Sequence, residues 1–345
     1  MDTSPAQPES GSETAAAVHL VELGFGHLYT AALRTAVGYR VADHLAEGPR
    51  TAEDLARRTG TDAGALRRVL RYLASREVFR QDEDGAFHLT PAAELLRTDV
   101  PGSLHPAISM LTHETFLRSS AGLEETVRSG EPAFPKVFGA PFFEYLRTDA
   151  ATRELFDAGM ASLSGPMDEL VAEAYPFPER GVLADVGGGR GGLLRAVLLR
   201  HPAMSGVLYD QEPALREHLL DTPELAGRWR TEAGDFFTAA PEGADFYVLK
   251  HVLHDWSDAD CVRILRSCRR ALAPGGRVLV VDAALPAGNE PHPGKALDVA
   301  MMAVLEGKER DAAELDALFA EADLVRTRVL PTATFTSIVE AEAAA

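Results

Sequence analysis

A glycine-rich segment at residues 183–192, L-A-D-V-G-G-G-R-G-G, is the most distinctive local pattern in the chain. It follows a short apolar run and precedes a helical pattern at residues 193–200. Glycines at such a strand-to-helix turn let the backbone bend sharply and approach a ligand closely. Gly187 and Gly189 fit the dinucleotide pattern G-x-G-x-x-G with Gly192, and the pattern G-x-G-x-G with Gly191. The glycines therefore predict a nucleotide-containing cofactor and leave its kind open.

Acidic residues near this loop favour a positively charged cofactor. Asp185 lies two residues before Gly187, where its charge would repel a pyrophosphate but suit a sulfonium with an amino-acid tail. Asp210 ends the next apolar run, and its carboxylate can accept both hydroxyls of a ribose. Asp235 and Phe236 follow a third strand region, where an acid beside an aromatic ring can hold an adenine. Each acid alone could be a strand-end cap, but their order after successive strands favours the cofactor site.

Three further motifs stand downstream. Residues 249–258 read L-K-H-V-L-H-D-W-S-D, residues 272–276 read L-A-P-G-G, and residues 307–310 read G-K-E-R. Together with the glycine loop and its acids, they resemble the class I, S-adenosylmethionine-dependent O-methyltransferases of the caffeic acid and acetylserotonin type. That family includes bacterial enzymes that finish aromatic natural products. The resemblance runs from about Val18 to the C-terminus, and H-D-W-S-D and G-K-E-R are specific to this branch.

The resemblance implies a fold, a cofactor and a set of site residues. The fold is α/β, with a Rossmann-like seven-stranded methyltransferase domain and an N-terminal helical, winged-helix dimerisation domain. The cofactor is S-adenosylmethionine, and its implied contacts are Asp185, Gly187, Gly189, Asp210, Asp235, Phe236, Lys250 and Trp256. His254 matches the catalytic base, Glu309 matches a carboxylate that orients it, and Asp282 stands where plant members usually have Glu. Which of the two carboxylates orients the base is left open.

The chemistry agrees with these residue types. A phenol with a pKa near 10 is a poor nucleophile at neutral pH, and a neutral imidazole can accept its proton as the oxygen attacks a sulfonium methyl group. A carboxylate bonded to the other ring nitrogen would fix the tautomer and stabilise the imidazolium. His251 is a rival base three residues before His254, able to face the same side if the stretch is helical. We prefer His254 because it alone fits the motif.

The resemblance places the acceptor pocket at Phe156, Met160, Met301 and Met302. Met and Phe at helical spacing are as often ordinary core residues. The identity of the acceptor, the hydroxyl that is methylated, and methylation of oxygen against nitrogen stay open.

The rest of the chain supplies the elements that would position this site. Thr51 and Asp62 are candidate N-caps of two short helices, the second at residues 63–75, and a hairpin pattern at residues 78–90 completes the outline of a winged helix. Short apolar runs alternating with helical patterns predict a parallel sheet covered by helices. The runs are residues 182–186, 207–210, 246–249, 277–282 and 325–330. The predicted parts are a disordered tail (1–17), the dimerisation domain (18–104), a helical linker and substrate-pocket region (105–175) and the S-adenosylmethionine-binding domain (176–345).

Composition excludes several other classes. The formal net charge of −18 makes nucleic acid and anionic membrane surfaces poor partners. We find no apolar run long enough to cross a bilayer and no signal peptide, and we expect a cytoplasmic protein. Cys261 and Cys268, seven residues apart in a helical pattern, are too far apart for a disulfide and offer no metal site. We therefore expect both to be packing residues and expect no metal.

Other functions remain as alternatives. A winged helix can bind DNA, and Arg67, Arg68, Arg71 and Arg76 cluster on its second helix, but residues 1–100 carry more acidic than basic side chains. An NAD-dependent oxidoreductase fits the glycine loop but leaves H-D-W-S-D and G-K-E-R unexplained. Some relatives bind S-adenosylmethionine yet carry out hydroxylation or decarboxylation, and His254 favours methylation over these.

Overall fold

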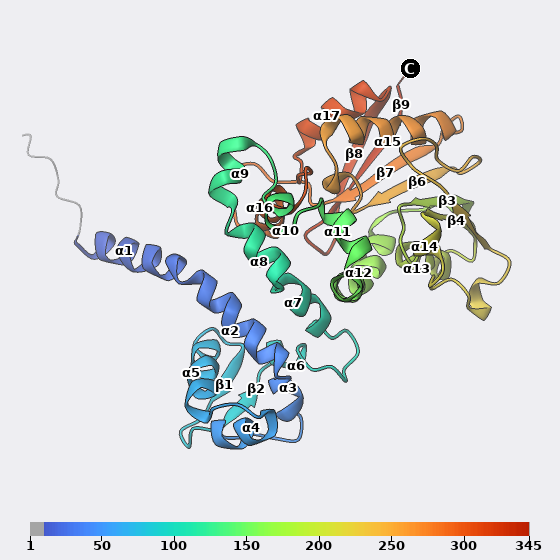
Figure 1. Ribbon diagram of the computed structural model, residues 1–345. Helices are drawn as coiled ribbons and strands as arrows, with labels where there is room; N and C mark the ends of the chain where they lie inside the picture. The colour runs from blue at the N-terminus through green and yellow to red at the C-terminus, as the bar shows by residue number, and fades with distance from the viewer. Residues whose placement is uncertain (1–9, 345) are drawn as a thin grey trace, which may run out of the picture. The chain divides into compact units, whose positions relative to one another are not determined.

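The computed structural model describes residues 10–344, which form two compact units (Figure 1). The first consists of the described residues up to His113 together with Glu154–Ser162. The second consists of Glu114–Arg153 and the chain from Leu163 onward. The first unit thus extends beyond the expected boundary at residue 104, and residues 105–175, expected as one region, are divided between the units.

The N-terminal unit consists of short helices and one hairpin, as the sequence predicts. The side chains of Thr51 and Asp62 accept hydrogen bonds from backbone N–H groups one turn into their helices, so both predicted N-caps are confirmed. The hairpin is antiparallel, and its Phe79 and Phe87 are buried among the helices. Its elements are α1 (Ser10–Gly24), α2 (Gly26–Gly38), α3 (Val41–His44), α4 (Ala52–Thr59), α5 (Ala63–Ala74), β1 (Phe79–Gln81), β2 (Phe87–Leu89), α6 (Pro91–Glu94) and α7 (His105–Leu111).

Helix α1 begins inside the segment predicted as an N-terminal tail. It begins at Ser10, so residues 10–17 are helical, and residues 1–9 of that prediction lie outside the described part of the chain. Three consecutive alanines at residues 15–17, the residue type of highest helix propensity, favour this early start. The helix exposes several large apolar side chains, namely Val18, Leu20, Val21 and Leu23.

The second unit contains a seven-stranded sheet in the order β5-β4-β3-β6-β7-β9-β8. The five strands from β5 to β7 are mutually parallel, whereas β9 is antiparallel to both of its neighbours. The run at residues 325–330 lies in the edge strand β8, which runs in the same direction as the five parallel strands but pairs only with the antiparallel β9, a strand that the sequence did not predict. The strands are β3 (Arg180–Val186), β4 (Ala203–Asp210), β5 (Trp229–Ala233), β6 (Phe246–Lys250), β7 (Arg277–Asp282), β8 (Leu324–Pro331) and β9 (Ser337–Ala343).

Helices cover both faces of this sheet (Figure 1). Successive residues of a strand point to opposite faces: Leu183 packs with α13 on one face, and Ala184 packs in the cluster with α15 and α17 on the other. Cys261 and Cys268 are buried and unbridged in that second cluster, which confirms them as packing residues. The helices are α8 (Glu114–Ser120), α9 (Leu123–Ser129), α10 (Phe134–Phe138), α11 (Phe142–Thr148), α12 (Ala150–Ala174, shared between the units), α13 (Gly192–Arg200), α14 (Glu212–Leu215), η1 (Pro223–Leu225), η2 (Leu253–Asp255), α15 (Asp258–Ala271), α16 (Pro293–Val304) and α17 (Ala312–Glu321).

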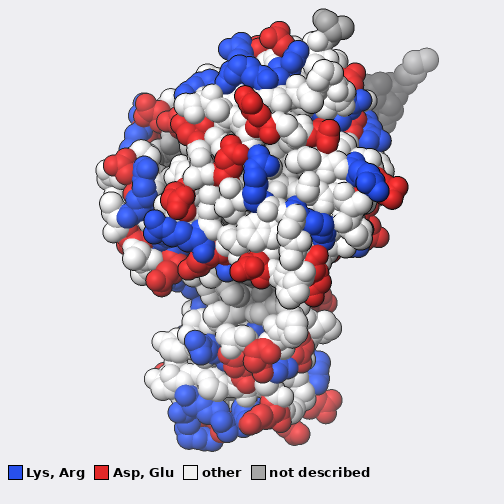
Figure 2. Space-filling model, turned by 90° about the vertical axis from the view of Figure 1, so that its right-hand side faces the viewer, with Lys and Arg blue, Asp and Glu red and all other residues white. Residues whose placement is uncertain are grey.

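The surface carries side chains of both charges (Figure 2). No helix within residues 10–344 is both long and apolar enough to span a membrane. On the face drawn in Figure 2, acidic and basic side chains are intermixed, without a continuous basic band.

Candidate active site

The carboxyl ends of four neighbouring parallel strands carry the candidate residues. Strands β4, β3, β6 and β7 end at Asp210, Val186, Lys250 and Asp282, respectively. Because parallel strands end on the same edge of a sheet, the segments that follow them meet there. This edge is where open α/β sheets bind their ligands.

The glycine loop follows β3 directly and is packed tightly. Gly187 has φ +70°, and a Cβ there would lie 2.9 Å from Cγ2 of Val252, with the ring of Phe236 also close. Gly188 lies against the carboxylate of Asp185, which a Cβ would overlap. The loop therefore needs glycine both for its backbone angles and for space.

Asp210 shapes this loop from the neighbouring strand. Its Oδ2 accepts a hydrogen bond from the backbone N–H of Gly189 at 2.8 Å, and its Oδ1 accepts one from Gln211 at 2.6 Å. Burial raises the pKa of Asp210, and the two backbone hydrogen bonds oppose that rise. A carboxylate oxygen has two lone pairs, so each oxygen keeps acceptor capacity for a ligand hydroxyl.

Asp185 is almost completely buried beneath the loop and lacks a full set of partners. Only 1% of the residue is exposed, and its Oδ2 has no hydrogen-bond partner. Burial raises its pKa to about 7, while the charge of Lys250 acts in the opposite direction. A buried carboxylate without a partner is costly unless a cation reaches it, so this site suits a cationic ligand.

Lys250, predicted as a cofactor contact, is held in an ion pair. Its Nζ donates a hydrogen bond to Oδ1 of Asp168 at 2.5 Å, and both side chains are largely buried. Burial raises the pKa of Asp168, and the charge of Lys250 lowers it. The sequence analysis missed Asp168, because it lies in the long helix α12, 82 residues before Lys250 and outside every motif.

Asp235, Phe236 and Trp256 lie around an aromatic cluster. The ring of Trp256 meets those of Phe236 and Phe237 edge-on and stacks on Phe143 with centroids 5.9 Å apart. Asp235 accepts a hydrogen bond from the backbone N–H of Phe237, so it forms the turn that presents the rings. Since Phe236 also borders Gly187, the cluster adjoins the glycine loop.

His254 lies in η2 and is hydrogen-bonded to Glu309. Its Nδ1 is 2.7 Å from Oε1 of Glu309, and both residues are buried. The backbone N–H of Glu309 donates to Oδ1 of Asp298 at 3.0 Å, which fixes the loop that carries the carboxylate. On the other side of the ring, Nε2 of His254 lies 3.4 Å from Oδ1 of Asp255. Of the two carboxylates left open by the sequence, Glu309 is the one hydrogen-bonded to His254.

The G-K-E-R loop is fastened to the H-D-W-S-D turn. Arg310 is 3% exposed and donates hydrogen bonds of 2.8 to 3.0 Å to the carbonyls of Leu253 and Trp256 and to the carboxylate of Asp258. A Cβ at Gly307 would collide with the carbonyl of His254. The two motifs thus form one packed structure, although 55 residues separate His254 from Glu309.

Charges around His254 make it a strong base. Burial alone lowers its pKa, but the charge of Asp255, the hydrogen bond to Glu309 and the charge of Asp282 raise that pKa to about 10. Burial also raises the pKa values of Asp255 and Asp282. The cluster therefore retains a proton on the imidazole more firmly than a free histidine does.

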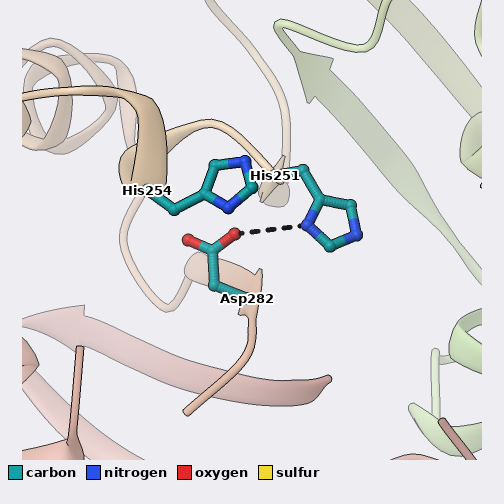
Figure 3. Close-up of side chains that lie close together, drawn as sticks. All are labelled: His251, His254 and Asp282. Carbon is teal, nitrogen blue, oxygen red and sulfur yellow. Dashed lines mark ion pairs between the residues drawn. The ribbon is translucent and has the colours of Figure 1, made fainter. Parts of the chain in front are cut away.

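His251 and Asp282 lie beside His254 (Figure 3). Nδ1 of His251 is 3.8 Å from Oδ1 of Asp282, and the two imidazole rings are 5.2 Å apart. The stretch is not helical as far back as His251, which has φ +53° and follows the end of β6. Burial holds the pKa of His251 well below its usual value, with the charges of His254 and Lys250 acting in the same direction.

The four predicted pocket residues fall into two pairs. Phe156 and Met160 lie in the part of α12 that belongs to the N-terminal unit. Met301 and Met302 lie in α16 of the second unit, where Met301 is buried and Met302 is half-buried. The structure describes each pair within its own unit, so their joint role in a pocket remains a prediction.

Comparison with known proteins identifies the family. Residues 121–324 match the O-methyltransferase domain model, and residues 21–99 match the O-methyltransferase dimerisation domain model. The chain is 39% identical to the phenazine O-methyltransferase PhzM of Lysobacter antibioticus, over 93% of this chain and 95% of that protein.

Solved structures agree with these matches. The structure of CalO1, a methyltransferase in calicheamicin biosynthesis in its SAH-bound form, superposes with a TM-score of 0.89 and 43% identity, covering 98% of this chain and all of that one. An O-methyltransferase from neocarzinostatin biosynthesis, solved with S-adenosyl-L-homocysteine and 1,4-dihydroxy-2-naphthoic acid, has a TM-score of 0.76 and 38% identity, covering 91% and 95% of the two chains.

The relatives also differ in chemistry. They include an 8-amino-8-demethylriboflavin N,N-dimethyltransferase of Streptomyces davaonensis, 33% identical over 97% of both chains. The family match nevertheless covers both units of the fold and both specific motifs. The chain belongs to the O-methyltransferase family and carries both the O-methyltransferase domain and the dimerisation domain of that family.

Proposed function

We propose that the protein transfers a methyl group from S-adenosylmethionine to a hydroxyl, of phenolic type, on a small aromatic natural product. Family membership supports the reaction class, and the relatives named above act on, or were solved with, aromatic ring systems. The observation that carries the proposal is the hydrogen bond of 2.7 Å between buried His254 and Glu309. His254 follows β6, the strand next to the one that the glycine loop follows.

The residues at the glycine loop fit S-adenosylmethionine. When bound, it supplies an electrophilic methyl group on a sulfonium. The unpartnered Oδ2 of Asp185 is available to the positively charged amino-acid tail. Asp210 retains acceptor capacity for ribose hydroxyls, and Phe236 offers an aromatic surface for an adenine. Lys250 would act on the cofactor indirectly, because its ammonium group is paired with Asp168.

His254 serves as the general base. Glu309 holds Nδ1–H, so Nε2 is the nitrogen that accepts the proton of the acceptor hydroxyl. Against the effect of burial, the charge of Asp255 and the hydrogen bond to Glu309 raise the pKa of His254 toward that of a phenol. The imidazole therefore holds the transferred proton better than a free histidine does, and the enzyme molecules in which it is neutral carry out the transfer, so the rate should rise with pH. Glu309 and Asp282 then stabilise the imidazolium, the first by a hydrogen bond and the second by its charge. The protein thus needs to position the two reactants and remove one proton.

Substitution of His254 tests this role. His254→Ala is expected to lower kcat by the ~10²–10⁴-fold that a general base contributes, while the S-adenosylmethionine affinity measured by calorimetry stays within about twofold of the wild type. His88→Gln is the matched control, since it removes a half-buried imidazole of the N-terminal hairpin that is also paired with a carboxylate. A kcat unchanged by His254→Ala would refute the general-base role.

The protein acts as a homodimer through its N-terminal unit. The family's dimerisation domain covers residues 21–99, and α1 exposes apolar side chains that a partner subunit would bury. Light scattering after size exclusion is expected to give twice the chain mass of 37.1 kDa. Leu20→Glu combined with Leu23→Glu is expected to shift the mass toward that of one chain, and a monomeric wild type would contradict the proposal.

A nitrogen acceptor is the second candidate. One relative is an N,N-dimethyltransferase, and the same base could take a proton from an aromatic amine as well as from a phenol. A panel of matched aromatic alcohols and amines, analysed by mass spectrometry with labelled S-adenosylmethionine, separates the two. Heat released by NAD and not by S-adenosylmethionine in the same calorimeter would return the glycine loop to the dinucleotide alternative.

A further inference from the structure

A cluster of metal-ligating side chains surrounds the proposed base. His251, His254 and Asp282 each offer one ligand atom, and these atoms all lie within 4.8 Å of one another (Figure 3). The two histidines come from the segment after β6, and Asp282 ends the neighbouring strand β7. From the sequence, only Cys261 and Cys268 are weighed as metal ligands, and no metal is expected.

The cluster contains buried polar atoms without hydrogen-bond partners. Nδ1 of His251, Oδ1 of Asp282 and Oε2 of Glu309 are all of this kind. The side chains of His251 and Asp282 are 9% and 8% exposed, so water satisfies them poorly. A buried polar atom without a hydrogen-bond partner destabilises the folded state. Three such atoms in one cluster therefore indicate that a ligand could bind there and satisfy them.

The cluster is rich in acidic side chains as well. Asp255, Asp282 and Glu309 bring three carboxyl groups to the two imidazoles. The charges of Lys250 and Arg310 reach the cluster, but Lys250 is bonded to Asp168 and Arg310 to Asp258. Among these carboxylates, Glu309 has His254 as its hydrogen-bonded cationic partner. A divalent cation would supply further positive charge to the group.

The donor set selects the kind of cation. Two imidazole nitrogens and a carboxylate oxygen suit Zn²⁺ and its first-row neighbours, whereas Mg²⁺ prefers oxygen ligands alone. Zn²⁺ bonds of ~2.0–2.1 Å place tetrahedral ligand atoms about 3.4 Å apart. The 3.8 Å between His251 Nδ1 and Asp282 Oδ1 is close to that separation, and small side-chain rotations would close the rest.

Two features already orient the ligands. Nδ1 of His254 lies on the side of Asp282 (Figure 3), and Oε1 of Glu309 lies 2.7 Å from the same nitrogen, so this carboxylate would border a metal bound there. The left-handed backbone of His251, φ +53°, directs its ring back toward Asp282 at the end of the strand. Histidine is among the residues that tolerate this conformation best.

We propose that His251, His254 and Asp282 form a binding site for a divalent transition-metal ion of the Zn²⁺ type, and that its occupation inhibits methyl transfer. The ion would replace the proton on Nδ1 of His254, the ring nitrogen on the side of Asp282 (Figure 3). The neutral ring would then carry its proton on Nε2, which could no longer accept the proton that the proposed function assigns to it. Inhibition thus rests on that function, whereas metal binding does not. His251 contributes to the metal site alone.

The binding test uses the full-length protein after treatment with EDTA and removal of the chelator. Titration with Co²⁺ is expected to produce a visible absorption band that saturates at one equivalent, and Zn²⁺ is expected to abolish it by displacement. Mg²⁺ should leave the band unchanged. His251→Asn and Asp282→Asn are expected to weaken Co²⁺ binding by at least roughly tenfold, and asparagine suits the left-handed backbone at residue 251.

The activity test separates the site from the reaction. Zn²⁺ is expected to abolish wild-type methyl transfer reversibly, with recovery on EDTA addition. In EDTA, His251→Asn is expected to keep kcat within a few-fold of the wild type and to need at least roughly tenfold more Zn²⁺ for inhibition. His201→Asn is the control, because His201 stacks edge-on against Phe177 and contacts no member of the cluster.

Each result bears on a different part of the proposal. Absence of a Co²⁺ band in the folded wild type, or a band that neither variant weakens, would refute the site. Metal binding that His251→Asn weakens, without any inhibition by Zn²⁺, would refute the inhibition alone. Absence of methyl transfer in EDTA would count against the proposed function, and the absorption titration would still decide the metal site. Thermal melting of Asp282→Asn checks that this variant folds.

Discussion

The glycine loop after β3 and the histidine cluster after β6 lie at the same edge of one sheet but are built differently. The loop is held mainly by its backbone: both oxygens of Asp210 accept hydrogen bonds from backbone N–H groups, and glycines leave room for the close packing. The cluster is held mainly by contacts between side chains, and three of their buried polar atoms have no hydrogen-bond partner. A backbone site is sensitive to added atoms, whereas a side-chain site is sensitive to lost charges.

The largest expected effect comes from neutralising a charge in the cluster. Glu309→Gln keeps the size of the side chain but removes the negative charge beside His254, so we expect kcat to fall on the order of 10²-fold. The kinetic pKa of the base should fall as well, because a neutral amide stabilises imidazolium less. Steady-state rates across pH measure both. Glu306→Gln, an exposed neighbour, is the control, and an unshifted pH profile would exclude the positioning role.

The next effect comes from adding one carbon to the loop. Gly188→Ala would place a Cβ against Asp185 and 2.7 Å from Cδ1 of Leu208, so S-adenosylmethionine affinity should fall at least about tenfold, or ~1.4 kcal/mol. Gly189→Ala meets no atom within 4 Å but has φ +56°, so its main cost is about 1–2 kcal/mol of backbone strain. Calorimetry and thermal melting separate the two. Equal losses of affinity would mean that Asp185 is not the sensitive group.

The pH dependence of cofactor binding sharpens the same point. A carboxyl with a pKa of about 7 gains its negative charge as pH rises, so affinity for the cationic cofactor should increase roughly tenfold between about pH 6 and pH 7.5. Asp185→Asn should abolish that dependence. The sign for stability is opposite: the folded pKa exceeds the unfolded 3.8, so the free energy of unfolding falls as pH rises from about 4 to about 7. A pH-independent wild-type affinity would remove Asp185 from the contact set.

The smallest expected effect comes from Ser257 in the H-D-W-S-D motif. Ser257 accepts a hydrogen bond from the backbone N–H of Asp260 and so caps α15. Ser257→Ala is expected to lower the free energy of unfolding by about 1 kcal/mol with kcat nearly unchanged, as measured by urea denaturation and steady-state assay. A large loss of kcat would show that this serine contributes to the reaction as well as to the helix.

Local signals predicted much of the fold. The caps Thr51 and Asp62 and the hairpin at β1 and β2 were predictable because their determinants lie within a few residues of one another. Strand β9 and its antiparallel pairing were missed, because its partners β7 and β8 are set by the tertiary structure and not by the local pattern. Helix α1 was missed at its start, where composition resembled a tail.

The site was predictable in its residues and less so in its pairings. Motifs named His254, Glu309 and Asp282, but only the three-dimensional structure pairs Glu309 with His254 and brings His251 to Asp282. Asp168 gave no signal, because a single acid in a long helix resembles a solvent-facing residue until its partner Lys250 is known. The roles assigned to the predicted residues remain proposals that the substitutions above would test.

The hydrogen bonds of Arg310 have a consequence for how such enzymes diverge. Because this side chain ties the G-K-E-R loop to the carbonyls of Leu253 and Trp256, His254 and Glu309 are held together as a single unit. Side chains elsewhere in the chain can then change without disturbing the hydrogen bond between His254 and Glu309. Transplanting both motifs together into a related scaffold should preserve that geometry, whereas exchanging either one alone would separate the base from its partner.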